Sequence, residues 1–235
     1  MKTITKKGRT RKTAGELALP RKTAAQKERA KRVLAELYKY YPNAHCELDY
    51  KTPHELLVAT ILSAQATDAA VNKATPALFR AFPTPAAFAA ATPAQIEPYV
   101  KSLGFFRNKS KAVHGAMTMV VNEHGGKVPN TMADLLKLPG VARKTANVVL
   151  GNAYGINDGV VVDTHVIRVA KRLGLTNHSD PKKIELDLMA LFPPEEWTML
   201  SHLLIWHGRR ACKARGGSCN EHPLCRKFCK NCNAK

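Results

Sequence analysis

Two groups of residues in this chain have types and spacing that could do chemistry, and the cysteines form the first. Five of the six cysteines lie within the last 24 residues, at Cys212, Cys219, Cys225, Cys229 and Cys232. Four cysteine thiolates can bind zinc or an iron–sulfur cluster. Zinc sites typically contain two closely spaced pairs, and only the last two cysteines are so close here. The spacing therefore favours an iron–sulfur cluster and leaves zinc open.

The second group surrounds a lysine that follows a tight turn. Pro139 and Gly140 separate a short helical segment from an Ala- and Val-rich one that begins at Lys144. Backbone N–H groups left free by such a turn, at the positive end of the next helix, form a cradle for a phosphate. A contact of this kind positions a protein on a nucleic acid without identifying bases. The alternative is an ordinary corner between two helices.

Charge supports the phosphate hypothesis. The chain has 37 Lys and Arg against 18 Asp and Glu, a formal net charge of +19. Such an excess indicates a polyanionic partner, with nucleic acid as the first candidate. A basic solubility surface or a ribosome-associated protein would have a similar composition. Residues 1–22 are basic with little apolar spacing and are expected to form a flexible tail, which either tethers DNA or has no function.

Targeting signals are missing from the sequence. No stretch approaches the roughly 20 apolar residues that span a bilayer, and the basic N-terminus lacks the apolar core of a secretory signal. We therefore expect a cytoplasmic, nucleoid-associated protein without membrane contact. In that reducing environment the clustered cysteines indicate metal ligands rather than disulfides. Cys46 stands alone and is expected to be a small buried apolar residue.

The elements that must position these residues are helical. Apolar residues recur at three- and four-residue spacing, Thr–Pro and Asp–Pro pairs mark helix starts, and glycines mark helix ends. Helices are expected over 108–124, 144–154 and 163–173 among others, about ten in all. Only residues 159–162 look extended, which is too short for a sheet. The sequence predicts an all-α protein of one large or two small domains.

Five segments in this order resemble the endonuclease III family of helix–hairpin–helix DNA glycosylases. They are LSAQATDAAVNKAT (62–75), GFFRNKSKA (104–112), LPGVARKTANVVL (138–150), VVDTHVIRV (161–169) and HGRRAC (207–212) before the cysteines. The resemblance covers roughly residues 25–230. Ala142 stands where the family's hairpin has a second glycine, and alanine tolerates a positive φ less well. The phosphate cradle should survive this change with a slightly altered turn.

The resemblance implies a fold of two helical subdomains with the active-site cleft between them and a C-terminal iron–sulfur loop. Residues 23–45 and 130–235 would form one subdomain, with the cluster loop at 208–235. Residues 46–129 would form the helical bundle, followed by the helix–hairpin–helix at 132–155. A monomer is expected, since nothing in the sequence suggests a coiled coil or an apolar dimer face.

The resemblance also implies the chemistry. A base-excision-repair glycosylase with abasic-site (AP) lyase activity would remove oxidised pyrimidines from duplex DNA through a Schiff base on Lys144 and then cleave by β-elimination. Asp163 would stabilise positive charge on the sugar and assist proton transfer, in addition to capping its helix. The adenine-specific branch of the superfamily lacks this lysine. A non-catalytic or weakly active DNA-binding relative of the same fold is the alternative.

DNA contacts follow from the same resemblance. Gln65 would insert opposite the estranged base, and Phe105 would be the second wedge, where relatives often have leucine. A solvated Gln65 and a core Phe105 are the plainer alternatives. The hairpin residues expected to contact DNA are Leu138, Gly140, Ala142 and Arg143.

The resemblance finally refines the cluster. The family's cysteine pattern is C-x6-C-x2-C-x5-C; the first step matches from Cys212 to Cys219, but His222 occupies the next ligand position. We therefore expect a rearranged [4Fe–4S] cluster. Its ligands would be Cys212, Cys219, Cys225 and either Cys232, slightly preferred, or Cys229. His222 is a less favoured ligand, and the basic loop around the cluster would face the DNA backbone.

Overall fold

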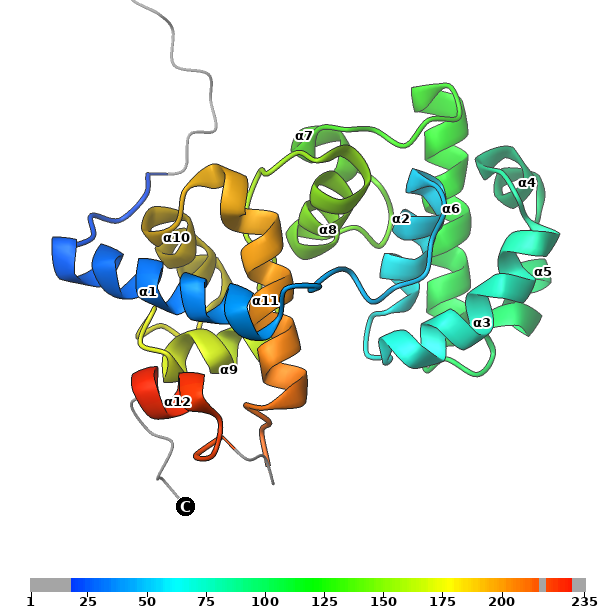
Figure 1. Cartoon of the computed structure of the whole chain (residues 1–235). Coiled ribbons are helices and arrows are strands. Elements are labelled where there is room, and N and C mark those ends of the chain that lie inside the picture. The colour runs from blue at the N-terminus through cyan, green and yellow to red at the C-terminus, as the bar shows by residue number, and fades with distance from the viewer. Residues whose placement is uncertain (1–17, 216–218, 230–235) are drawn as a thin grey trace, which may run out of the picture.

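The described part of the chain is entirely helical, which confirms the all-α prediction. The computed structural model describes residues 18–215 and 219–229 and contains no strand within them. Figure 1 shows the arrangement of the elements. They are α1 (Ala24–Tyr40), α2 (Pro53–Leu62), α3 (Asp68–Ala81), α4 (Pro85–Ala90), α5 (Pro93–Val100), α6 (Phe106–His124), α7 (Met132–Leu135), α8 (Arg143–Tyr154), α9 (Thr164–Arg172), α10 (Pro181–Leu191), the 3₁₀ turn η1 (Pro194–Glu196), α11 (Trp197–Arg210) and α12 (Pro223–Phe228).

Helix starts are set by short polar side chains, as the sequence indicates. The hydroxyls of Thr52, Thr84 and Thr92 each accept a hydrogen bond from the first turn of a helix that begins with proline. These caps satisfy donors that have no partner within the helix. Helices α6 and α8 end on Gly125 and Gly155, whose φ values of 58° and 65° are left-handed.

Apolar side chains form two separate cores. The first is built by α2–α8 and includes Leu57, Phe88 and Met117, all fully buried. The second is built by α1 and α9–α12 and includes Leu37 and Leu204. In Figure 1 the second group lies at the left, α2–α6 lie at the right, and α7 and α8 lie between them.

The hairpin helices contribute their apolar residues to the first core. Leu135, Leu138 and Val149 are all buried within it. The division of the chain at residues 45/46 and 129/130 remains a prediction. What the packing establishes is that α8 is anchored on α2 and also contacts α11 of the second group.

The chain passes between the two cores in two segments, residues 41–52 and residues 155–163. The second ends in an extended run in which Val160 and Val161 are buried. This run has no neighbouring strand within the described residues; instead the Val161 N–H donates to Ser201 Oγ at 2.9 Å. Asp163, the N-cap of α9, is the last residue of this segment.

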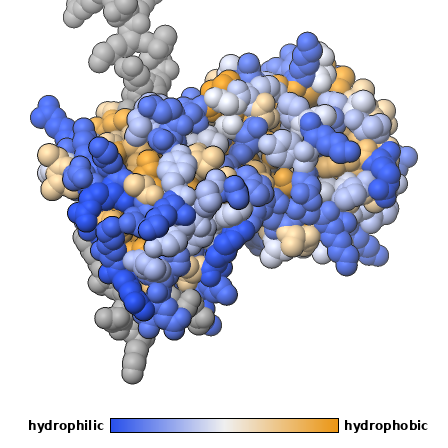
Figure 2. Space-filling model, viewed as in Figure 1, coloured by the Kyte–Doolittle hydropathy of each residue, from blue (hydrophilic) through white to orange (hydrophobic). Residues whose placement is uncertain are grey.

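The surface is mostly hydrophilic on the face seen in Figure 2, with hydrophobic residues in small patches. Within the described residues, no helix is both long enough and apolar enough to cross a membrane.

Candidate active site

One pocket brings together the lysine and the aspartate that are 19 positions apart in the sequence. Lys144 and Asp163 both line it. Residues of both cores and of the 41–52 crossing segment complete the wall, among them His45, Cys46, Glu47, Thr60, Ser63, Asp68, Val148, His202, Trp206 and Arg209. The pocket thus lies where the two helical groups meet, as the resemblance implied.

Each of the two residues is held by the start of a helix. Lys144 is the second residue of α8, and its side chain is exposed. The N-cap of this helix, Ala142, provides no side-chain hydrogen bond. Asp163 is the N-cap of α9, and its Oδ1 accepts from the Val166 N–H at 2.8 Å. This bond confirms the predicted capping role and fixes the orientation of the carboxylate. Its catalytic role remains a prediction.

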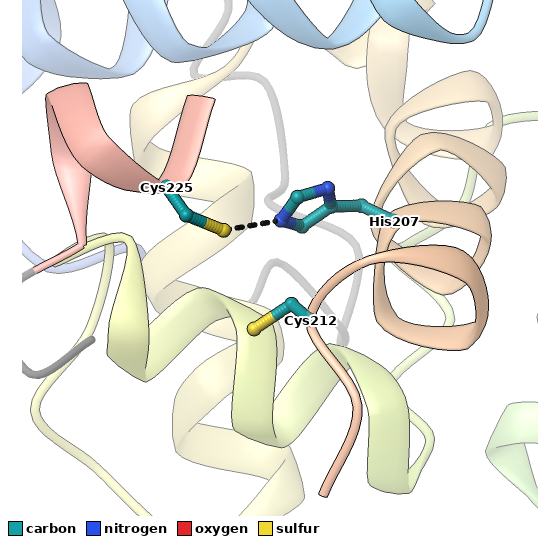
Figure 3. A group of neighbouring side chains, drawn as sticks. All are labelled: His207, Cys212 and Cys225. Carbon is teal, nitrogen blue, oxygen red and sulfur yellow. Dashed lines mark hydrogen bonds between the residues drawn. The ribbon is translucent and has the colours of Figure 1, made fainter. Parts of the chain in front are cut away.

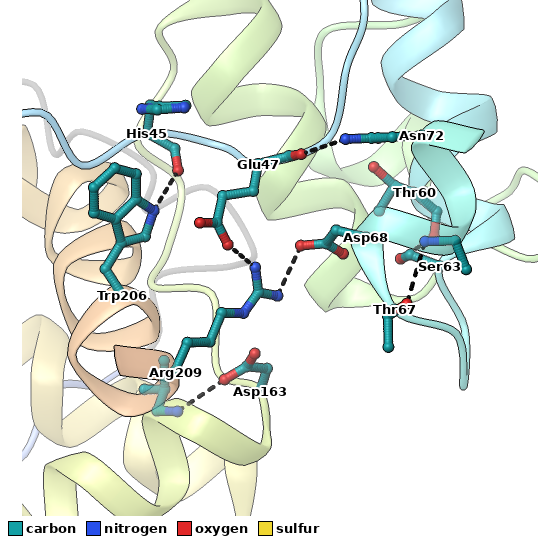
Figure 4. Close-up of polar contacts among 12 residues, drawn as sticks. His45, Glu47, Thr60, Ser63, Thr67, Asp68, Asn72, Asp163, Trp206 and Arg209 are labelled. Atoms are coloured by element: carbon teal, nitrogen blue, oxygen red, sulfur yellow. Dashed lines mark hydrogen bonds and ion pairs between the residues drawn. The ribbon is translucent and has the colours of Figure 1, made fainter. Parts of the chain in front are cut away.

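An ion-pair group forms another part of the wall, as Figure 4 shows. Arg209, at the end of α11, pairs with Glu47 of the crossing segment and with Asp68 at 2.7 Å, at the start of α3. Burial of Glu47 raises its pKa, but hydrogen bonds from Arg210 and Arg209 outweigh that effect and hold the pKa below its usual value. The group ties α11 of the second core to α3 of the first.

The hairpin turn is built around a glycine with a left-handed backbone. Gly140 has a φ of 76°, and the turn's hydrogen bonds use the N–H groups of Leu138 and Val141. The N–H groups of Gly140 and Ala142 donate to no acceptor in the described part of the chain. Ala142 has a φ of −100°, so the alanine in place of the family's glycine introduces no backbone strain.

The side chains of Leu138 and Arg143, both predicted to contact DNA, make contacts within the protein. The Leu138 side chain is 2% exposed and anchors the turn in the first core. The Arg143 guanidinium is directed to Glu185, with Nε 2.9 Å from Oε2, and towards Asp158. The DNA contacts of these residues remain predictions.

The two predicted wedge residues are distinguished by their backbone. Among the described residues, Gln65 (φ 54°) and Phe105 (φ 57°) are the only non-glycine residues with a positive φ. Such a conformation costs about 1–2 kcal/mol and tends to persist at functional sites. Gln65 is exposed in the loop between α2 and α3, and Phe105 is 63% exposed, so neither belongs to a core.

Packing brings the hairpin turn against helices α2 and α6. A Cβ at Gly140 would lie 2.9 Å from the Ala112 Cβ in α6 and 3.4 Å from Ile61 Cγ2 in α2. Ile61 precedes the Gln65 loop, and Ala112 lies in the helix that Phe105 starts. The hairpin turn therefore rests on the two elements that present the wedge residues.

The cysteines form a buried donor group with a histidine, shown in part in Figure 3. One ligand atom each from His207, Cys212 and Cys225 lie within 4.8 Å of one another. His207 Nε2 is 3.2 Å from Cys225 Sγ, and the sulfurs of Cys212 and Cys219 are 3.6 Å apart. The three predicted ligands are therefore neighbours. Cys229 is half-buried at the end of α12, and Cys232 lies outside the described residues.

Electrostatics favours the thiolate at Cys212. A hydrogen bond with Cys225 is the main cause that lowers the pKa of Cys212 to about 3, and the same bond raises the pKa of Cys225. Arg172 Nη1 also donates to Cys212 Sγ at 3.2 Å. Since the thiolate is the form that binds metals, this cysteine-rich group fits a metal cofactor of the C-terminal region.

Sequence reasoning missed several residues of these sites. In the sequence His207 stands out only as the first residue of a family segment. In the structure its ring is fully buried, and its Nδ1 lies 2.9 Å from the Tyr41 hydroxyl oxygen. Helix α12, which presents Cys225, is also absent from the predicted helices; its N-cap is a histidine, His222, followed by Pro223. Nothing in the sequence indicated that Arg209, Glu47 and Asp68 would meet.

Comparison with known proteins agrees with this geometry. Residues 58–194 match the model of the HhH-GPD superfamily base excision DNA repair proteins. The chain is 54% identical to an endonuclease III of Synechocystis sp., over 88% of this chain and 94% of that protein, and 44% identical to an endonuclease III of Bacillus subtilis, over 78% and 84%. A solved structure of a trapped endonuclease III–DNA covalent intermediate has 42% sequence identity and a TM-score of 0.82, covering 87% of this chain and 95% of that one.

Proposed function

We propose that Lys144 is the nucleophile of the glycosylase and AP lyase reactions of this protein, because the chain belongs to the HhH-GPD superfamily of base excision DNA repair proteins and to the endonuclease III family within it. The protein is a base-excision-repair DNA glycosylase with AP lyase activity. The observation that supports the residue assignment is the shared pocket of Lys144 and Asp163. Oxidised pyrimidines in duplex DNA are its proposed substrates.

The reaction follows from the two side chains. The neutral Lys144 amine forms a bond to C1′ of the damaged nucleoside, while the bond to the base breaks and the base leaves with its electron pair and takes up a proton. Opening of the sugar ring yields a Schiff base, whose positive nitrogen acidifies the C2′ proton. Loss of that proton expels the 3′ phosphate by β-elimination. Asp163 stabilises the positive sugar and assists the proton transfers.

The damaged base reaches the pocket only if it leaves the stack. Gln65 and Phe105 are proposed to fill the gap, because both are exposed and held in a left-handed conformation. Filling the gap offsets the few kcal/mol that unstacking costs. The N–H groups of Gly140 and Ala142 are proposed to hold a phosphate, and duplex DNA is thus the proposed partner of a monomeric protein.

We assign the cysteine group to a [4Fe–4S] cluster held by Cys212, Cys219, Cys225 and one of Cys229 and Cys232. Because Cys212 follows the end of α11 and Cys225 lies in α12, a bound cluster would crosslink these two helices. His207 beside three cysteines would also suit zinc, which binds Cys₃His sets. Absorbance near 400 nm with about four irons per chain supports the assignment; a colourless protein with one zinc would contradict it.

Borohydride trapping tests the proposed nucleophile. Wild type, Lys144→Gln and Lys137→Gln are incubated with duplex DNA containing thymine glycol, and borohydride reduces any Schiff base to a stable adduct. Lys137 is a matched control, because it is an exposed hairpin lysine paired only with Asp134. A shifted band in wild type and Lys137→Gln alone is expected. DNA binding without any adduct in wild type would favour the non-catalytic alternative.

A further inference from the structure

A buried carboxylate on α10 accepts hydrogen bonds from the helix that carries Lys144. Glu185 is 6% exposed, and its two oxygens accept from Arg143 Nε at 2.9 and 3.0 Å. Its Oε1 also accepts from Asn147 Nδ2 at 2.9 Å. Arg143 and Asn147 are one turn apart on α8, on either side of Lys144 in the sequence. The contacts therefore fix the first turn of α8 on α10, across the boundary between the two cores.

The same carboxylate lies against the segment that leads to Asp163. A Cβ at Gly159 would stand 2.1 Å from Glu185 Oε1, 2.9 Å from Asn147 Nδ2 and 3.0 Å from Arg143 Nη2. Only glycine leaves room for this approach. Arg143 also reaches Asp158, with Nη1 3.8 Å from Oδ2 and Nη2 3.4 Å from the carbonyl oxygen. The backbone at 158–159 is thus held at the Glu185 network, four residues before Asp163.

Burial makes this arrangement rigid. A carboxylate removed from water is tolerated only when charged and hydrogen-bonded partners replace its hydration. Since those partners belong to the Lys144 helix, moving that helix relative to α10 would break them. The extended run after Gly159 is held as well, because Val160 and Val161 are buried and Val161 donates to Ser201.

We propose that Glu185 is a positioning residue that sets the separation between the Lys144 amine and the Asp163 carboxylate. This inference rests on the proposed function, since it assumes that these two groups perform the reaction. Covalent attack needs the reacting atoms within about 3–3.5 Å, and a misplacement of about 1 Å can slow a reaction 100-fold. Loss of the Glu185 charge would loosen both attachments and slow Schiff-base formation while leaving the DNA-contacting surfaces in place.

Glu185→Gln tests the inference, with Asp187→Asn as a matched control. Asp187 is also a buried carboxylate of α10, 5% exposed, but its partners are Lys22, Thr176 and His178, none of which belongs to α8. The single-turnover rate of borohydride trapping is measured on duplex DNA with a preformed abasic site. The dissociation constant of each variant is measured on duplex DNA that contains a tetrahydrofuran abasic analogue. The thermal midpoint of unfolding is also measured for each variant.

Glu185→Gln is expected to trap about 10- to 100-fold more slowly than wild type with a dissociation constant within about twofold. Asp187→Asn is expected to lower the thermal midpoint and keep the wild-type rate. Trapping by Glu185→Gln at the wild-type rate, or an equal slowing in both variants, would overturn the inference and leave the proposed function intact. A wild type that forms no adduct would refute the proposed function first.

A second variant covers the case in which Glu185→Gln does not fold. Gly159→Ala keeps every charge and pushes a methyl group onto the Glu185 carboxylate. It is expected to show the same slower trapping with unchanged DNA affinity. Wild-type trapping by a folded Gly159→Ala protein would contradict the proposed link between the network and Asp163.

Discussion

The acid stability of this protein should depend on one half-buried histidine in the pocket wall, His202. His202 lies on α11, and its Nε2 is 2.8 Å from Asn152 Oδ1 of α8. Burial, with a smaller contribution from His45, lowers the pKa of His202 to about 4 from the ordinary value of 6.5. A charged ring would have to form inside the contact between α8 and α11. The perturbation that tests this is His202→Gln, which keeps a donor for Asn152 and cannot titrate.

The sign and size of the effect follow from proton linkage. Below pH 6.5 the unfolded chain binds a proton at this residue, whereas the folded protein does not until the pH approaches 4. The folded state is therefore stabilised above pH 6.5, and this stability is lost as the pH falls. With 1.36 kcal/mol for each pKa unit, the loss is about 2 kcal/mol at pH 5 and about 3 kcal/mol at pH 4.

Urea unfolding at a series of pH values from about 7.5 to 5 measures this contribution. The free energy of unfolding of wild type should fall towards pH 5 by about 2 kcal/mol more than that of His202→Gln. His178→Gln provides a comparison, because the His178 side chain is 49% exposed and pairs with Asp187 at 3.9 Å. Since this variant keeps His202, its free energy of unfolding should still fall towards pH 5. If the free energies of unfolding of wild type and His202→Gln fall in parallel with pH, the reasoning that His202 stays neutral in the folded protein is refuted.

Three further substitutions test the other parts of the site. Phe105→Ala should change the free energy of unfolding by less than about 0.5 kcal/mol, because the ring is 63% exposed. The same variant should excise thymine glycol from duplex DNA about tenfold or more slowly than wild type, because the wedge is lost. Unchanged excision would contradict the wedge role of Phe105. Arg209→Gln should lower the free energy of unfolding by about 1–2 kcal/mol at neutral pH. Because the arginines hold the pKa of Glu47 below its ordinary value of 4.5, this difference from wild type should shrink as the pH falls below 4.5 and Glu47 becomes protonated. A difference that persists in acid would contradict this reasoning. Cys225→Ser should lose the bound metal, measured by elemental analysis, whereas Cys46→Ser should retain it; equal metal content in the two variants would contradict the assigned ligand.

Much of the molecule could be predicted from short-range patterns. Thr and Asp caps, prolines at first helical positions and glycines after the last turn locate most helices, because these residues act on backbone groups a few positions away. The family segments likewise indicated Lys144 and Asp163 and an all-α fold. The same local logic explains the missed α12, whose cap is a histidine rather than the usual serine, threonine or aspartate.

The remaining site residues could not be found in this way, because their partners are distant in the chain. Arg143 follows the hairpin turn and looks like a cation for DNA, yet Glu185, 42 positions away, directs its guanidinium inward. Ala142 looks like a strained replacement for glycine, yet its φ of −100° is a backbone conformation that alanine adopts without strain. In both cases tertiary packing decided which of several locally allowed states is adopted.

The sequence by itself determined the helices, the basic character of the chain and the residue types that could do chemistry, since these depend on composition and on spacing within a few turns. Only the tertiary structure decided that Lys144 and Asp163 share one pocket, that His207 joins the cysteines, and that Gln65 and Phe105 are the residues held in left-handed backbone. The physical reason is that burial, ion pairing and close packing act through space. Their energies depend on which distant side chains the two cores bring into contact.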